Sequence, residues 1–531
     1  MAIGRMPNLA RLRADGAWGQ MRPSEPLLAR ALWTTVATGR NPAAHGVLTP
    51  WAARPDGGGV GPVGRSSWRA PAFWQILEAA GRRTLTVGWP ATAPATDWPG
   101  LHVDARFAVA TGPDFATWAV PRGAVSPAAM LQSVRALRVH PTDVAGAMLA
   151  PFVPRIAEID QYREPGLATL AVMLSGVSTI HAAATEVIAA QDWDVAAVHY
   201  DWLDPIQRWF LPHGVDSRFG GVVDAAYAFA DALLGRLMTL AGENATLFVV
   251  SPNGVRLGGT VDPGGAEQSM SWRGTGFIAA RGRWIEGGQT LPPARLVDIA
   301  PSLLARFGLV AETDGKRLSA LAPGQSRRTV SVPPMATPAP DRHVAALKAV
   351  GYDDTPSETA TAAIGRAEAA RLIALGEALL AAGRLADAER ALLAARTLLP
   401  ADSPSGLQRL ALCRLIRNDA AGCRAIGETL RRIAPEAGWG DLIVAAGHAL
   451  AGDAAAARPL MAAAQAKGGH DPELVNRLGG IALLLTDDAA AKAHFTAALA
   501  MDPEMVAARE GLAMAQQRTG GHSVGPREDT L

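Results

Sequence analysis

The polypeptide has 531 residues, of which 49% are hydrophobic and 19% are charged. This composition excludes a disordered chain, and at about 150 residues per domain the length predicts two to four folded domains. Fifty Lys and Arg residues against 49 Asp and Glu residues leave a net charge of +1, which excludes the basic surface of a nucleic-acid-binding protein. The two cysteines, Cys413 and Cys423, are too few for a disulfide framework or a four-thiolate zinc site.

The N-terminal segment contains Arg5, Arg11 and Arg13 and lacks the apolar core of a secretory signal. We therefore expect a cytoplasmic protein, although a start codon further upstream would leave room for a signal or an anchor. The longest stretch without a formal charge is Gly166 to Thr185, where several Thr, Ser and Gly residues keep the hydrophobicity modest. This pattern favours a buried or interfacial helix over a transmembrane segment.

Residues 1–325 alternate short apolar runs with helical patterns. The runs Arg83–Gly88, Val195–Tyr200 and Thr246–Ser251 are typical of strands that are buried on both faces. A helical pattern covers Ala225 to Leu240, just before the third run. Strands that alternate with helices predict an α/β domain with a mostly parallel sheet and helices on both faces. In such domains the chemistry lies at the carboxyl ends of the strands.

Residues 326–365 predict a linker, because Pro333, Pro334, Pro338 and Pro340 crowd together there with Ser and Thr. After it, residues 366–516 are rich in Ala and Leu and carry no strand signal. The spacing is periodic: the interval from Pro400 to Pro435 is 35 residues, and the interval from Pro435 to Pro503 is twice 34.

Two copies of this period carry the same small and apolar residues at corresponding positions. In the first copy these are Leu372, Leu375, Gly376, Leu379, Ala388, Leu392, Ala395 and Pro400. In the last copy they are Leu478, Gly479, Ala482, Ala491, Phe495, Ala498 and Pro503. The pattern resembles the tetratricopeptide repeat (TPR), with degenerate copies at about 403–436 and 437–470 and a flexible tail at 517–531. Small residues let the two helices of a repeat pack closely, so Cys423 is expected to be a buried thiol. The resemblance implies an all-α solenoid that binds a protein or peptide partner; it names neither the partner nor an oligomeric state.

Four stretches of the first 325 residues carry a second resemblance. They are Gly4–Leu9 with Leu12 and Gly16; Trp33–Gly39 with Pro42, His45 and Gly46; Tyr227–Leu237 leading into Leu247–Gly254; and Leu296–Leu304 with Gly308, Asp314 and Gly315. In order and spacing they resemble the alkaline phosphatase superfamily, most closely its type I phosphodiesterase/nucleotide pyrophosphatase branch. The insert at about 100–190 would then be a helical cap over the site, with Phe115, Trp118 and Phe152 available for packing.

The resemblance implies a hydrolysis in which two zinc ions activate a Thr or Ser nucleophile and clamp the phosphoryl oxygens. The first metal-binding Asp would precede Gly4, so either the first strand is missing or the start codon lies further upstream. The nucleophile, at the head of a helix nine residues before Thr38, would be Ala29, which has no hydroxyl. Ser24 lies five residues too early to replace it.

The remaining family ligands are mostly replaced. The Asp-x-x-x-His pair keeps Asp204 but has Arg208 in place of the imidazole. The Ser-Asp-His-Gly loop reads Ser251-Pro252-Asn253-Gly254, and the late His is Trp272 or its neighbour Ser271. Because one carboxylate cannot hold two divalent cations, the sequence predicts a catalytically inactive relative without a cofactor, acting in protein interaction or assembly through its repeats.

Two alternatives remain open at the sequence level. The first is a metal-dependent phosphoric or sulfuric ester hydrolase with a remodelled site, in which His199, Asp201 and His213 join Asp204 in binding zinc or another divalent cation. The second concerns Arg208, which would either anchor an anion such as phosphate or sulfate, or simply pair with Asp204 at the i, i+4 spacing of one helix face.

Overall fold

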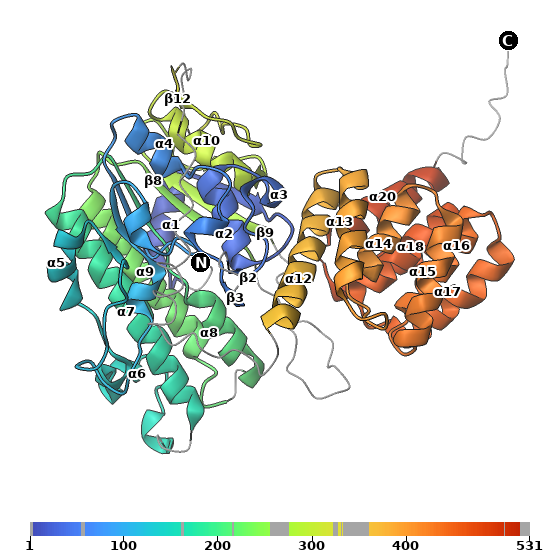
Figure 1. Cartoon of the computed structure of the whole chain (residues 1–531), viewed down its shortest axis with the longest axis horizontal. Coiled ribbons are helices and arrows are strands. Elements are labelled where there is room, and N and C mark those ends of the chain that lie inside the picture. The colour runs from blue at the N-terminus through green and yellow to red at the C-terminus, as the bar shows by residue number, and fades with distance from the viewer. Residues whose placement is uncertain are drawn as a thin grey trace, which may run out of the picture. The chain divides into compact units, whose positions relative to one another are not determined.

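The computed structural model describes residues 4–54, 59–160, 164–214, 217–254, 275–321, 328–330, 332, 360–503 and 505–520. These residues fall into two compact units, one ending at Ala367 and the other starting at Glu368. Figure 1 colours the first unit from blue to yellow-green and the second from orange to red. Most of the expected linker at 326–365 and the end of the expected tail, residues 521–531, lie outside the described residues.

The first unit contains a five-stranded sheet and a four-stranded sheet. One sheet has, in spatial order, β10 (Gln289–Thr290), β1 (Ala17–Arg22), β9 (Thr275–Arg281) and β8 (Leu247–Asn253), with β11 (Ala294–Arg295) also paired to β1. The other has β6 (Val125–Ser126), β5 (Leu101–Val103), β4 (Thr84–Val87) and β7 (Val195–Val198). Strand β9 runs antiparallel to both β1 and β8, whereas β4 runs parallel to β5 and β7. The three predicted strands are confirmed, and the sheets are mixed in direction.

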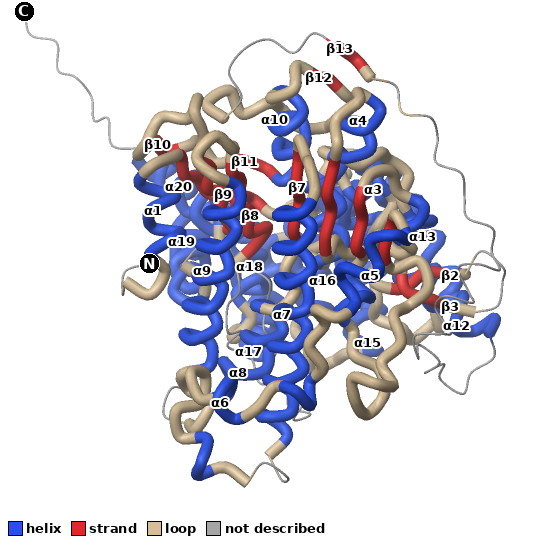
Figure 2. Tube along the Cα trace, turned by 90° about the vertical axis from the view of Figure 1, so that its left-hand side faces the viewer, coloured by secondary structure: helices blue, strands red, loops and turns tan. Residues whose placement is uncertain are grey.

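Strands β7 and β8 each end a sheet and have one unpaired edge among the described strands. All residues of β4, which is paired on both sides, are buried, but those of β7 and most of β8 are only half-buried. The residues of Val195–Val198 and Leu247–Val250 are therefore less buried than their apolar sequences predict. Figure 2 shows the strands of both sheets in red among the helices.

Helices surround these sheets. They are α1 (Pro7–Ala14), α2 (Ala29–Thr38), α3 (Pro42–His45), α4 (Phe73–Ala79), α5 (Leu131–Arg135), α6 (Gly146–Leu149), α7 (Pro165–Ala190), α8 (Leu203–Phe210), α9 (Val222–Ala241) and α10 (Ile299–Ala305). Short 3-10 turns are η1 (Arg65–Ser67), η2 (Ala95–Asp97), η3 (Ala105–Ala108), η4 (Ala128–Met130), η5 (Pro141–Asp143), η6 (Ile156–Glu158), η7 (Leu211–His213) and η8 (Leu296–Asp298). Two small strand pairs join β2 (Trp51–Ala53) to β3 (Val60–Pro62), and β12 (Leu309–Val310) to β13 (Arg328–Thr329).

The region at 100–190 is more than a helical cap, because it supplies β5 and β6 to the second sheet before α7 begins. Trp118 and Phe152 are buried as expected, whereas Phe115 is 37% exposed. Helix α7 is long and apolar enough to cross a membrane by length and composition, but over half of its most apolar 18-residue window is buried in the folded protein. This burial agrees with the expected core or interfacial helix.

The second unit consists of successive helical hairpins. Its helices are α12 (Ala360–Ala381), α13 (Leu385–Leu398), α14 (Leu407–Ile416), α15 (Ala420–Ile433), α16 (Trp439–Leu450), α17 (Ala454–Gly468), α18 (Pro472–Leu484), α19 (Asp488–Met501) and α20 (Val506–Gly520). Four hairpins, starting at α12, α14, α16 and α18, match the four predicted TPR copies. A β-carbon added at Gly479 would lie 2.7 Å from the Phe495 ring, so the glycine is what lets α18 and α19 approach. Cys423 is buried, as predicted.

Candidate functional site

The head of α2 is where the family nucleophile is expected. Ala29 is the first residue of this helix, and the preceding Leu28 makes no side-chain cap. The nearest hydroxyl upstream, that of Ser24, is buried and has no hydrogen-bond partner among the described residues. The structure therefore places a methyl group at the helix start, where an attacking oxygen would be needed.

Asp204 and Arg208 lie one turn apart on α8 and bind each other. Arg208 donates from Nε to Asp204 Oδ2 over 3.0 Å. The other carboxylate oxygen of Asp204, Oδ1, is buried without a partner in the described part of the chain. Partial burial raises the pKa of Asp204, and the neighbouring Arg208 guanidinium opposes that rise. The guanidinium thus supplies the positive charge that a metal would bring to this carboxylate.

At the end of β8, the polar side chains form hydrogen bonds with neighbouring main-chain oxygens. Ser251 donates from Oγ to the main-chain oxygen of Asn253 over 3.2 Å, and Asn253 donates from Nδ2 to the Gly254 oxygen over 3.1 Å. These bonds shape the strand end, and neither side chain is an imidazole or a carboxylate. Trp272 and Ser271, at the late His position, lie outside the described residues.

His199, the first alternative ligand, is a core residue. Its ring packs edge-on against Trp33, with centroids 4.6 Å apart, and its Nδ1 lies 3.2 Å from the Gly88 main-chain oxygen. Burial lowers the pKa of His199, and the nearby Asp201 carboxylate opposes that shift. Asp201 itself is exposed, and the side chain of His213 lies outside the described residues.

Among the described residues, no set of side chains fits a metal centre. Across the described ranges there is no group of three or more His, Cys, Asp or Glu side chains that could hold a metal ion. Zinc needs at least three protein ligands in a catalytic site, whereas Asp204 has one oxygen committed to Arg208. The pair of zinc ions implied by the family therefore has no ligand set in the described part of this unit.

Side chains of the matched stretches bind the main chain. Asp231 on α9 is buried and accepts hydrogen bonds from the main-chain N–H groups of Asn8, at 2.9 Å, and Leu9, at 2.8 Å. Asn8 also donates from Nδ2 to Asp231 Oδ2 over 3.0 Å. These are first-turn amides of α1, which have no partner inside the helix. The matches at Gly4–Leu9 and at Tyr227–Leu237 are thus two halves of one structural contact.

The fourth stretch has a similar role. Asp298 accepts from the main-chain N–H of Arg295 and of Lys316, at 2.9 and 2.7 Å. Asp314 accepts from the main-chain N–H of Asn41 over 2.7 Å, next to the Thr38–Gly39 match. The matched stretches therefore include side chains that bind the main chain and stabilise the fold. At the positions where the family's chemistry is expected, the chain has Ala29 and Arg208.

A pocket of the second unit lies along the first helices of its hairpins. It has a volume of about 390 Å³ and is lined by α14, α16 and α18, with contributions from α20. Its apolar side chains include Leu412, Leu415, Trp439, Ile443, Leu450 and Leu484. Its polar side chains include Arg409, Glu473, Asn476 and Arg477. We call this cavity the repeat groove; sequence reasoning found the repeats but not these lining residues, which recur at equivalent positions of successive first helices.

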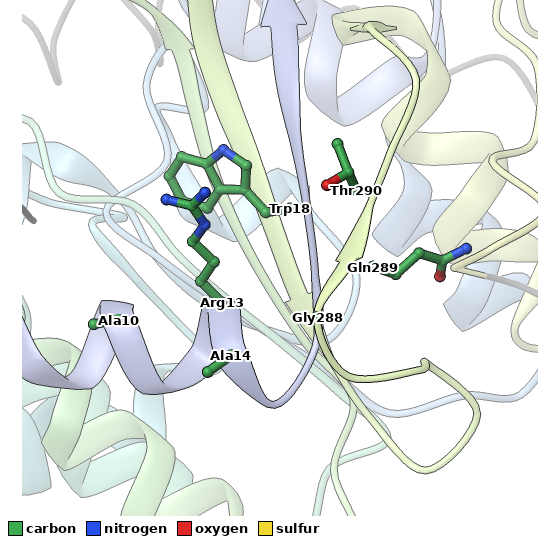
Figure 3. Close-up of a pocket in the computed structure, with 7 residues that line it drawn as sticks. All are labelled: Ala10, Arg13, Ala14, Trp18, Gly288, Gln289 and Thr290. Atoms are coloured by element: carbon green, nitrogen blue, oxygen red, sulfur yellow. The ribbon is translucent and has the colours of Figure 1, made fainter.

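A smaller pocket of about 230 Å³ lies beside β1 and β10 in the first unit. Figure 3 shows Arg13 and Trp18 at this pocket, with Gln289 and Thr290 from β10. The Arg13 guanidinium lies over the Trp18 ring at 5.3 Å from its centroid. None of the residues predicted for catalysis, metal binding or anion binding lines this pocket, so it is separate from the family site.

Comparison with known proteins matches a family model to part of the first unit. The family model described as type I phosphodiesterase / nucleotide pyrophosphatase matches residues 1–256. A search of curated proteins returns no match.

Solved structures with similarity are distant. Human ectonucleotide pyrophosphatase/phosphodiesterase 5 is 10% identical over 60% of this chain and 94% of its own, with a TM-score of 0.37. Phosphonoacetate hydrolase from Sinorhizobium meliloti 1021, in complex with phosphonoformate, is 16% identical over 49% of this chain and 53% of its own, with a TM-score of 0.30. The APC/C hetero-tetramer Cut9-Hcn1 is 17% identical over 34% of this chain, with a TM-score of 0.26, and the chain spans 40% of that protein's length.

Proposed function

We propose that the protein is a catalytically inactive relative of the type I phosphodiesterase / nucleotide pyrophosphatase family, whose model matches residues 1–256, because Ala29 and Arg208 stand where a nucleophile and an imidazole ligand are expected. In this proposal it serves as an interaction or assembly factor, with the repeat groove as the binding site for a partner protein. It needs no metal for this role. The observation that carries the proposal is the Asp204–Arg208 ion pair at 3.0 Å, which occupies the one retained ligand position.

The family reaction depends on the positive charge of bound metal ions, which in this proposal the site does not hold. A two-metal mechanism stabilises the attacking and leaving oxygens through cations held by several ligands. Here a methyl group at Ala29 replaces the attacking oxygen, and Arg208 occupies the position of an imidazole ligand. An arginine is always protonated and cannot ligate a metal, so the change removes a ligand and adds a competing charge.

Metal content and turnover test the proposal. The full chain, purified without chelator, is expected to hold far less than one zinc or manganese ion per chain. It is also expected to hydrolyse bis(p-nitrophenyl) phosphate no faster than a heat-denatured sample with either metal added. A stoichiometric metal together with turnover that Asp204→Asn abolishes would instead establish the remodelled hydrolase with His199, Asp201 and His213 as candidate ligands.

A further inference from the structure

Strands β7 and β8 each have one side on which no described strand pairs with them, and we call these two sides the open edges. All of β4, which is paired on both sides, is buried, whereas all of β7 and all of β8 except Pro252 are half-buried. Apolar edges of this kind are usually covered in folded proteins, because their main-chain groups bind other strands. The open edges therefore mark a place where a strand can be added.

Both open edges border one shared core. Alternate residues of the two strands pack against a single apolar cluster to which α2, α4 and α10 contribute; these residues are Val195, Ala197, Phe248 and Val250. Figure 2 shows β7 on the side of its sheet that lies nearer to β8. The two sheets are thus two parts of one layer, which the same helices cover on this face.

The opposite face of this layer is covered as well. Ala196 and Val198 of β7 pack in a cluster with α7, and Leu247 and Val249 of β8 pack in a cluster with α9. Helices α7 and α9 pack against each other in a third cluster. A strand between the open edges would therefore have helices on both faces, so its sequence should be apolar throughout instead of alternating.

The connection from β7 to β8 leaves room for such a strand. The chain passes between them through α8 and α9, which is the helical crossover that joins parallel strands of one sheet. In doubly wound sheets a crossover of this kind can pass over an earlier strand, as strands 2 and 3 flank strand 1 in the order 2-1-3-4-5. The strand between β7 and β8 is thus expected to come from an earlier part of the chain.

The main chain of β7 directs donors at its open edge. Val195 and His199 donate from their main-chain N–H groups to main-chain oxygens on the β4 side, over 3.2 and 2.9 Å. Successive N–H groups of a strand point to opposite sides in the plane of the sheet. Those of Ala196 and Val198 therefore point towards the open edge, where an added strand would accept them.

The start of α1 indicates which part of the chain is close enough. Met6 packs in the cluster that contains Leu247 and Val249 of β8, so the chain enters α1 beside that strand. Asp231 on α9 holds the first-turn amides of α1 in the same place. Residues 1–3 are fewer than the four residues of β7, so a strand here needs residues that precede Met1.

We propose that a segment of this protein upstream of Met1 forms a β-strand between β7 and β8, binds the main chain of Ala196 and Val198, and joins the two sheets into one. The segment is a run of about five apolar residues, the usual length of a strand. The inference concerns the scaffold and does not depend on the proposed function.

Hydrogen exchange tests this proposal. The chain expressed from the nearest in-frame start codon upstream of Met1 is compared with the 531-residue chain by mass spectrometry with electron-transfer fragmentation. The amides of Ala196 and Val198 should exchange at least about tenfold more slowly in the longer chain, because a paired sheet amide exchanges only after local opening. Amides of α16, in the second unit, are the control and should exchange alike in both chains.

A proline variant of the longer chain identifies the protecting segment. Proline cannot donate to a neighbouring strand, so replacing the central residue of the upstream apolar run should return Ala196 and Val198 to the exchange rates of the 531-residue chain. Slow exchange that survives this replacement would place the protecting segment elsewhere and overturn the proposal.

Two other outcomes would also overturn it. One is a reading frame without an apolar run upstream of Met1, and the other is equal exchange of Ala196 and Val198 in the two chains. Either outcome would leave the open edges to a strand from a partner protein. Neither bears on the proposed function, which metal content and turnover test separately.

Discussion

The two units of the chain differ in how far along the sequence their functional residues are spread. In the α/β unit the family site would draw on positions near 29, 204 and 253, which lie on α2, α8 and β8, far apart in the sequence. In the helical unit the groove is built by neighbouring hairpins between Gln408 and Gly511. At these positions the chain has Ala29 and Arg208, whereas Asp231 and Asp298 in the matched stretches accept hydrogen bonds from the main chain.

Substitution of Asp231 should lower the free energy of unfolding more than substitution of Asp204. Asp231→Ala removes the acceptor for the Asn8 and Leu9 amides and leaves buried donors unpaired, which should cost about 4 kcal/mol of unfolding free energy. Asp204→Ala, the matched change at the former ligand position, should cost less than about 1 kcal/mol. Urea denaturation of both variants measures the difference, and equal losses would contradict the distinction between scaffold and former site.

Three glycine-to-alanine changes should affect stability differently, according to what a β-carbon would meet in the sheet, in a repeat hairpin and in α7. A β-carbon at Gly276 would lie 1.9 Å from the Ser251 main-chain oxygen in the β8–β9 ladder, so Gly276→Ala should cost about 3 kcal/mol. At Gly479 the obstacle is the Phe495 ring, which can tilt, so Gly479→Ala should cost about 1 kcal/mol. Gly176 in α7 has no neighbouring atom within 4 Å, and Gly176→Ala should stabilise the protein by about 0.5–1 kcal/mol. Shifts in the urea midpoint at constant m-value report all three.

Acid should destabilise the α/β unit through two buried histidines. Burial lowers the pKa of His45 and of His102 to about 3. The unfolded histidines take up a proton below about pH 6.5 and the folded ones do not, so stability is full above that pH and falls as the pH decreases towards 3. At pH 5 each histidine should remove about 2 kcal/mol.

His102→Leu tests this origin of the pH dependence. Neither ring nitrogen of His102 has a hydrogen-bond partner among the described residues, so the variant loses no bond there. Its unfolding free energy should depend less steeply on pH between 7 and 5 than that of the wild type. His470→Leu, at an exposed site of the second unit, is the control and should leave the slope unchanged.

The smallest expected effect concerns Asp204 and Arg208. Their ion pair is partly exposed and follows the i, i+4 spacing, so a double-mutant cycle with Asp204→Asn and Arg208→Ala should give a coupling of about 0.3–0.5 kcal/mol. Arg208→Ala should leave inorganic phosphate binding unchanged. A loss of phosphate binding in that variant would show that Arg208 is an anion anchor as well as an ion-pair partner.

The regular features of the fold were predictable because they are periodic. The runs at Val195 and Leu247 have the length and apolarity of buried strands, and the spacing of Gly376, Gly479 and the prolines reveals the hairpins. The half-burial of β7 and β8 was not predictable, since the sequence of a strand does not show whether its edges are paired. The lining of the repeat groove was equally hidden, because it depends on which positions of successive repeats face the same cavity. The expectation that Ala29 stands at the nucleophile position rests on family spacing, and no composition or periodicity signal marks it.

The pairing of β1 with β9 has a consequence for synthesis on the ribosome. Ala17 pairs with Ala280, about 260 positions later, and a ribosome that adds about 5–20 residues per second needs on the order of 10–50 s to cover that distance. During that time β1 lacks the strand beside which it will lie, and its apolar residues are open to chaperones or to other nascent chains. Each helical hairpin, by contrast, is complete within a few seconds of its first residue. Strand β1 is thus made long before the strand that will enclose it.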